Sequence, residues 1–224
     1  MTSPLPALSL LEARVLGVLV EKQHTVPDTY PLTLNALAAG CNQKTSRDPI
    51  LSATDGEIQA ALDHLRSLAL VVESSGGRVM RYAHNVERVL QVPPQSVALL
   101  AVLMLRGPQT AGELRINCER LHRFADISAV EAFLTELAER TAGPLVVELA
   151  RQPGARENRW AHLLSGAPAP ESVARASVAV ESSNPIALGD LAALRAEVGR
   201  LAGELEELKM TVARICTDLG VSSR

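Results

Sequence analysis

Aromatic residues are scarce in this sequence. Phe, Trp and Tyr together make up 2% of 224 residues, whereas 47% of the residues are hydrophobic. A core must therefore be built mainly from Leu, Val, Ile and Ala. Cysteines are also few: Cys41, Cys118 and Cys216 are odd in number and far apart. Their spacing excludes a disulfide framework or a zinc-type motif and favours a reducing compartment.

Long apolar runs and a basic leader are absent as well. Charged residues or Pro interrupt each hydrophobic run before it reaches membrane-spanning length. We therefore expect a cytoplasmic protein without a membrane partner. The residues offer no nucleophile–base constellation, Walker loop or paired carboxylates, and Cys118-x-x-x-His122 is a poor metal pair. The sequence thus predicts no catalytic residue, metal or cofactor, and a protein that is not an enzyme.

The sequence also lacks an excess of positive charge, because its formal net charge is −3. Residues 1–89 hold eight basic and nine acidic residues, residues 90–166 hold eight of each, and residues 167–224 hold six basic and eight acidic residues. The net charge therefore argues against a protein that binds nucleic acid by bulk attraction alone. Any binding of nucleic acid would depend on local clusters of basic residues.

An internal repeat is present. Residues 78–84, Arg-Val-Met-Arg-Tyr-Ala-His, return 78 positions later as residues 156–162, Arg-Glu-Asn-Arg-Trp-Ala-His. Each copy follows a Gly-bearing turn, and each turn follows an apolar run that ends in Glu. An apolar run, a turn and an alternating run predict a β-hairpin in each copy. The alternation places Tyr82 and Trp160 inward, with the neighbouring arginines outward.

Helical patterns precede each hairpin. In the first copy, Ser9 with Glu12 predicts a capped helix, a short helix carries Leu32, Leu34, Leu37 and Ala38 and ends at Gly40, and a third begins at Thr54 or Asp55. In the second copy a helix stops at Gly107-Pro108, and Thr110 and Ser128 are expected to cap the next two. We therefore predict a mainly α fold with small β-hairpins (α+β), made of tandem winged helix-turn-helix domains over residues 1–89 and 90–166.

The tail has a different pattern. Residues 167–188 are rich in Ser, Ala and Pro and are typical of a flexible linker. Residues 189–221 carry apolar residues at alternating steps of three and four, which predicts a coiled coil and a homodimer. The alternative is a helix that lies on its own body or is disordered when free. The predicted oligomerisation residues are Leu191, Leu194, Val198, Leu201, Leu205, Leu208, Val212, Ile215 and Leu219.

Several motifs resemble one family closely. They include Glu12-Ala13-Arg14-Val15-Leu16-Gly17, Cys41-Asn42-Gln43-Lys44 and Leu105-Arg106-Gly107-Pro108-Gln109-Thr110, together with Trp160-Ala161-His162-Leu163. In these motifs the chain resembles the bacterial YceH-like family. The resemblance implies a tandem winged-helix fold and no enzyme activity. A regulatory role on DNA is implied only by analogy of fold.

The third helices are poor candidates for reading bases. The first carries Asp55, Glu57 and Asp63 against Arg66, and the second carries Glu131, Glu136 and Glu139 against Arg140. Carboxylates repel phosphates, so contact with double-stranded DNA is expected from the hairpins and basic loops instead. The candidate nucleic-acid-binding residues are Lys44, Arg47, Arg78, Arg81, Arg115, Arg120, Arg123, Arg151, Arg156 and Arg159.

Two hypotheses of function follow. The first is a dimeric, transcription-regulator-like protein that contacts DNA phosphates through its hairpins. The second is a protein–protein interaction adaptor on a winged-helix scaffold, which the acidic third helices and the heptads favour. A third possibility gives these residues no binding role: Arg81 and Arg159 would form cross-strand ion pairs with Glu73 and Glu148, and His84 and His162 would be packing or hydrogen-bonding residues.

Overall fold

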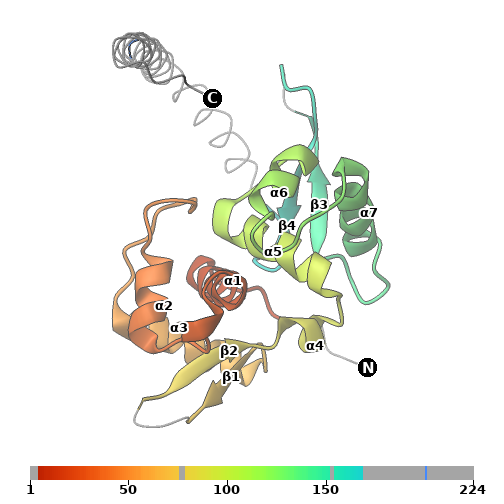
Figure 1. The fold of residues 1–224 in the computed structure, drawn as a ribbon. Coiled ribbons are helices and arrows are strands. Elements are labelled where there is room, and N and C mark those ends of the chain that lie inside the picture. Colours follow the sequence, from red (N-terminus) through yellow and green to blue (C-terminus); the bar gives the residue numbers. More distant parts are fainter. Residues whose placement is uncertain (1–4, 76–78, 152–153, 169–199, 201–224) are drawn as a thin grey trace, which may run out of the picture. The chain divides into compact units, whose positions relative to one another are not determined.

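The computed structural model describes residues 5–75, 79–151, 154–168 and Arg200. These residues form a mainly α fold with two small antiparallel hairpins, as predicted (Figure 1). The elements listed below all fall in one compact unit, Met1–Val173. The boundaries predicted inside this unit, at residues 89 and 166, stay predictions.

The first repeat runs from α1 (Leu10–Thr25) to β2 (Arg81–His84). Between them lie the 3-10 helix η1 (Pro27–Thr29), α2 (Leu34–Cys41), α3 (Asp55–Ser67) and β1 (Val71–Ser74). Capping boxes begin α1 at Ser9 and α3 at Thr54, as their sequence predicts. Leu32 was expected inside the second helix, but it precedes the N-cap of α2, Thr33. The backbone of Leu32 pairs instead with Tyr82 of β2.

The second repeat follows a short connecting helix, α4 (Val86–Leu90). It comprises α5 (Pro94–Arg106), α6 (Ala111–Asn117), α7 (Ile127–Ala138), β3 (Val146–Leu149) and β4 (Arg159–His162). The predicted cap Thr110 begins α6 with a complete capping box. The predicted cap Ser128 is wrong: Asp126 caps α7 by accepting from the backbone N–H of Ala129, and Ser128 lies within the helix.

Both hairpins pair in the same way. Glu73 lies opposite Tyr82 in the first, and Glu148 lies opposite Trp160 in the second. A single residue that precedes the second helix of each repeat bridges to that same aromatic residue, Leu32 to Tyr82 and Gln109 to Trp160. The resulting order of helix, bridging residue, two helices and hairpin is consistent with a winged helix-turn-helix in each repeat.

The first helices of the two repeats pack against each other, α1 on α5, and the buried residues of both repeats join in one core. Gly17 permits this close approach, because a Cβ there would lie 3.0 Å from Cγ of Leu105. Tyr82 is only 4% exposed, as predicted, whereas Trp160 is half-buried against the core. In Figure 1 the hairpin β1–β2 and the hairpin β3–β4 lie on opposite sides of the central pair α1 and α5.

Candidate nucleic-acid interface

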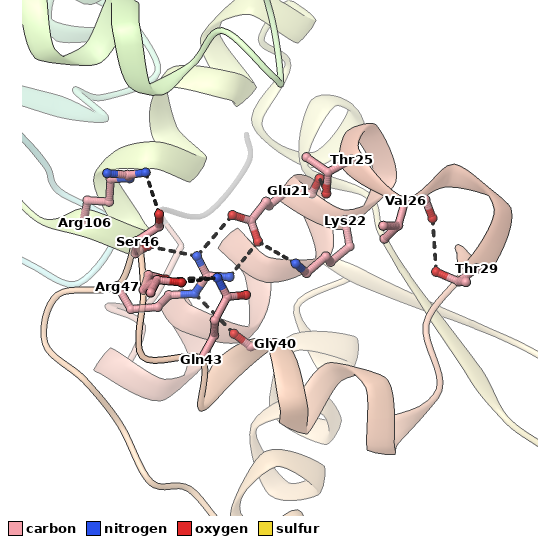
Figure 2. A network of polar contacts seen from close by, with 11 residues as sticks. Glu21, Lys22, Thr25, Val26, Thr29, Gly40, Gln43, Ser46, Arg47 and Arg106 are labelled. Atoms are coloured by element: carbon pink, nitrogen blue, oxygen red, sulfur yellow. Dashed lines mark hydrogen bonds and ion pairs between the residues drawn. The ribbon is translucent and has the colours of Figure 1, made fainter. Parts of the chain in front are cut away.

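Arg47 was a candidate for DNA contact, but the structure buries it in the first repeat (Figure 2). Its guanidinium donates to both carboxylate oxygens of Glu21 on α1, at 3.1 and 2.6 Å, and to the carbonyls of Gly40 and Ser46. Burial acts to raise the pKa of Glu21, but the hydrogen bonds and charge of Arg47, helped by Lys22, outweigh burial and hold that pKa below its usual value. Arg47 is therefore a structural cation, which corrects its assignment to the interface.

The arginines of the two hairpins also have partners within the chain. Arg81 donates to the carbonyls of Thr29 and Pro31, at 3.2 and 2.7 Å. Arg159 lies 3.7 Å from Glu113 at the start of α6. Both guanidiniums are thus engaged by groups of the same chain, and neither is a strong candidate for a phosphate contact.

The cross-strand ion pairs considered for these arginines are wrong. Glu73 pairs with Arg66 of α3 at 2.8 Å, and Glu148 accepts a hydrogen bond from the side-chain amide of Asn158. The register explains the difference, because Arg81 lies opposite Ser74 and Arg159 lies opposite Leu149. Each Glu faces the aromatic residue instead.

Six candidate residues remain exposed. Five of them form no side-chain hydrogen bond or ion pair with any described residue, and the sixth, Arg115, donates one long hydrogen bond of 3.4 Å to the carbonyl of Ala125. Five of the six belong to the second repeat. The exposed candidates are Lys44, Arg115, Arg120, Arg123, Arg151 and Arg156. Arg78 and the predicted oligomerisation residues Leu191 to Leu219 lie outside the described residues.

The hairpin and α6 of the second repeat lie close together. The pair Arg159–Glu113 joins β4 to the first turn of α6. A Cβ added at Gly112 would lie 3.8 Å from a carboxylate oxygen of Glu157 and 3.9 Å from Ile127 at the start of α7. The starts of α6 and α7 and the turn end of the hairpin β3–β4 therefore share one side of the repeat.

The third helices have acidic exposed faces. On α3, Asp55, Glu57 and Asp63 are exposed, and Arg66 is held by Asp63 at 3.1 Å as well as by Glu73. On α7, the exposed charges are those of Glu131 and Glu136. Arg140, just beyond α7, donates to the carbonyl of Leu90. Neither helix therefore offers an uncompensated cation to a major groove.

One feature of the second helices was not recognised in the sequence. Three kinds of residue recur with an offset of 77 positions between the repeats. They are the bridging residues Leu32 and Gln109, the caps Thr33 and Thr110, and the cysteines Cys41 and Cys118. Both cysteines are buried, and burial raises the pKa of each thiol to about 12. When the two repeats are aligned with this offset, Ala38 and Ala39 of α2 correspond to Arg115 and Ile116 of α6. Two of the exposed apolar and basic side chains of α6 are thus replaced by alanine in the first repeat.

His84 has hydrogen-bonding partners within the chain, whereas Nδ1 of His162 is buried without such a partner among the described residues. The ring of His84 hydrogen-bonds with the side chain of Gln23, and its backbone N–H donates to the Tyr30 hydroxyl. Burial lowers the pKa of each histidine to about 4, with the charge of His24 adding to the effect at His84.

The described residues include no group of three or more His, Cys, Asp or Glu suited to a metal ion. Within that same part of the chain, no helix combines the length and apolar character needed to cross a membrane.

Comparison with known proteins identifies the family of the chain. Residues 8–155 match the family model described as "Protein of unknown function, DUF480". The chain is 60% identical over 209 residues to a UPF0502 protein of Dechloromonas aromatica, covering 93% of this chain and 96% of the relative. It is 58% identical to UPF0502 proteins of Burkholderia multivorans, over 96% of this chain and 91% of the relative, and of Burkholderia vietnamiensis, over 96% and 90%. The chain therefore belongs to the DUF480/UPF0502 family, which confirms the resemblance to uncharacterised YceH-like bacterial proteins.

Proposed function

We propose that this protein binds double-stranded DNA through its second repeat, by contacts with phosphates and with little reading of bases. The observation that carries the proposal is the clustering of exposed arginines there. Segments 115–123 and 151–156 together contain five arginines and one carboxylate, that of Glu119. A local excess of cations of this kind can bind a phosphate backbone even though the net charge of the chain is −3.

The geometry supports phosphate contact over base contact. Arg151 and Arg156 flank the tip of the hairpin β3–β4, which is where a wing meets the DNA backbone. Arg115, Arg120 and Arg123 belong to α6 and the loop that follows it. The acidic face of α7 would repel phosphates on entering the major groove, so the sequence preference of the protein is expected to be weak.

A salt titration tests this function directly. If the five arginines each neutralise one phosphate, log K should fall with log salt at a slope of about −4 to −5 for each chain that contacts the DNA. Duplexes of unrelated sequence should compete almost equally. The variant Arg151→Ala/Arg156→Ala should reduce the slope by about 2 for each such chain, whereas substitution of Arg88, an exposed arginine on the connecting helix α4, by Ala should leave the slope unchanged. A wild-type chain that shows no measurable slope would contradict the proposal.

The proposal also includes a cytoplasmic homodimer without enzymatic activity. Dimerisation would double the number of phosphate contacts and is supported by the heptad pattern of residues 189–221. Sedimentation of the full chain should give twice the mass of 23.9 kDa. Removal of residues 189–224 should then yield a monomer with weaker DNA binding.

A protein–protein adaptor is the second candidate, and the acidic third helices favour it. The carboxylates of Glu131, Glu136 and Glu139 form no ion pair within the described residues, so they remain available to a basic partner. Partners captured from nuclease-treated lysate should be lost with Glu131→Lys/Glu136→Lys if the adaptor function is correct. If partners are instead lost on nuclease treatment of the wild-type capture, DNA binding is the better explanation.

A further inference from the structure

A small hollow lies on the second repeat, at the end of α6. It has a volume of about 110 Å³ and is lined by Arg115, Ile116, Glu119, Arg123 and Phe124. Water occupies roughly 30 Å³ per molecule in the liquid, so the hollow can admit a group of a few heavy atoms. All five lining residues come from one short stretch of chain. The hollow therefore forms without any rearrangement between the repeats.

The charges around the hollow favour an anion. The lining includes two arginines and one glutamate, and Glu119 forms no ion pair with either arginine. Arg123 has no hydrogen-bonding partner among the described residues, and Arg115 uses one donor on the carbonyl of Ala125. An arginine has five N–H donors, so most of the donors at the hollow are unused. Guanidinium groups bind phosphate through paired hydrogen bonds.

The apolar residues of the lining, Phe124 and Ile116, favour an anion that carries an apolar group. Phe124 is buried and packs edge-on against His122 and Phe133, with ring centroids 4.7 and 5.9 Å away, so the floor of the hollow is fixed. Ile116 at the rim is 70% exposed. An anion with an apolar neighbour would contact both kinds of surface. A phosphodiester flanked by sugar rings has this character, whereas inorganic phosphate does not.

We infer that this hollow binds a phosphate group, and that the phosphate is a phosphodiester of the nucleic-acid backbone. Arg115 and Arg123 donate to its non-bridging oxygens, and Ile116 packs against the adjoining sugar. The inference rests on the proposed function and assigns one phosphate contact to a defined place. The first repeat lacks the site, because Ala38 and Ala39 stand at the positions of Arg115 and Ile116. A free phosphate ester is the other source of the same chemistry.

The experiment measures binding of a fluorescent 20-base-pair duplex to the full-length chain by anisotropy. Arg115→Ala/Arg123→Ala should weaken binding by at least tenfold, from the loss of two charged hydrogen-bonding groups. Glu119→Gln should strengthen binding about twofold to fivefold, because it removes the one carboxylate. Ile116→Ala should weaken binding by about twofold to threefold without changing the salt slope. Arg88→Ala is the matched control and should have no effect. Circular dichroism melts establish that each variant is folded.

The outcomes distinguish failure of the phosphate site from failure of DNA binding. If the wild-type chain binds DNA and Arg115→Ala/Arg123→Ala behaves like Arg88→Ala, the hollow is not a phosphate site although DNA binding stands. Titration with a nucleoside monophosphate provides the second arm. If the chain binds this ester but not DNA, and the double variant loses the ester, the phosphate site stands with a free ester as its ligand and the proposed function fails. Binding of neither probe would overturn both.

Discussion

The two repeats share their element order, their capping threonines and their hairpin register, yet they use arginine differently. In the first repeat, Arg47, Arg66 and Arg81 are all occupied by carboxylates or carbonyls of the same chain. In the second, Arg120 and Arg123 remain exposed and without such partners. A repeated fold can therefore use the same residue type for internal contacts in one copy and leave it exposed in the other.

For Arg47, the cause of the difference is the loop between the second and third helices. In the first repeat this loop spans residues 42–54 and lies against α1 and α5, where Arg14, Arg47 and Arg106 satisfy its carbonyl and hydroxyl groups. Polar groups buried in such a contact need hydrogen-bonding partners. The shorter loop of the second repeat, residues 118–126, makes no comparable use of its arginines.

The largest effect is expected from removal of a structural arginine. Arg47→Ala leaves the partly buried Glu21 with only Lys22, 3.3 Å away, as a cation among the described residues and should lower the free energy of unfolding by about 3 kcal/mol. Arg123→Ala should change it by no more than about 0.5 kcal/mol. Urea denaturation measures both. Because the penalty comes from a partly buried carboxylate that has lost its main cation, the double variant Arg47→Met/Glu21→Met should recover much of the loss. Equal effects of Arg47→Ala and Arg123→Ala would remove the distinction between the repeats.

The second largest effect is a loss of stability in acid that both repeats share. His84 and His162 have pKa values of about 4 in the folded chain against 6.5 for an unburied histidine. Between these values the unfolded chain binds more protons, so stability must fall as pH decreases from about 6.5 to about 4. The lowered pKa values of Glu12 and Glu21 act in the same direction below about 4.5.

Each histidine should contribute on the order of 2 kcal/mol to this loss. Thermal melts between pH 4 and pH 8 provide the measurement. His84→Gln and His162→Gln should each remove about half of the histidine-dependent part, since the two sites are equally perturbed. A pH dependence that survives in both single variants and in the double variant would show that other groups cause it.

The third effect concerns the packing of α2 on α1. A Cβ at Gly40 would lie 2.6 Å from Cγ1 of Val18, which is fully buried. Gly40→Ala should therefore cost about 1–3 kcal/mol in the free energy of unfolding. Gly56→Ala is the matched control, because nothing lies within 4 Å of its added Cβ and α3 would gain roughly 0.5–1 kcal/mol from the better helix former. The second repeat has Asn117 at the position of Gly40, so it needs no such glycine.

Much of this arrangement was predictable from local signals. The repeated motif of residues 78–84 and 156–162 predicts both hairpins, and the Ser9–Glu12 and Thr110–Glu113 spacings predict two helix starts. Such signals act over a few residues and are legible in the sequence. Ser128–Glu131 has the same spacing, however, and the N-cap of α7 is Asp126, two residues earlier. Local spacing alone does not decide between two adequate caps.

The arginines were harder to assign, because their roles depend on contacts between distant segments. Arg47 follows a polar loop in the sequence, and only the fold brings it to Glu21, 26 positions away. Arg81 similarly meets carbonyls about 50 positions earlier. The hollow beside Arg115 and Arg123 depends on how the chain turns after α6. Residue type and charge pattern identify the candidates, and tertiary contacts decide which of them remain exposed.

The smallest effect tests how firmly the two repeats are joined at the surface. Arg106 of α5 donates to the hydroxyl of Ser46 at 2.8 Å, and both residues are accessible to solvent. Ser46→Ala should therefore lower the free energy of unfolding by only about 0.5–1 kcal/mol. Ser46 also has a φ of +59°, a conformation that favours glycine. Ser46→Gly loses the hydrogen bond but relieves the backbone, so it should be close to neutral in urea denaturation. If Ser46→Gly were as destabilising as Ser46→Ala or more so, relief of the backbone at Ser46 would not offset the lost hydrogen bond, and the expected neutrality would be wrong.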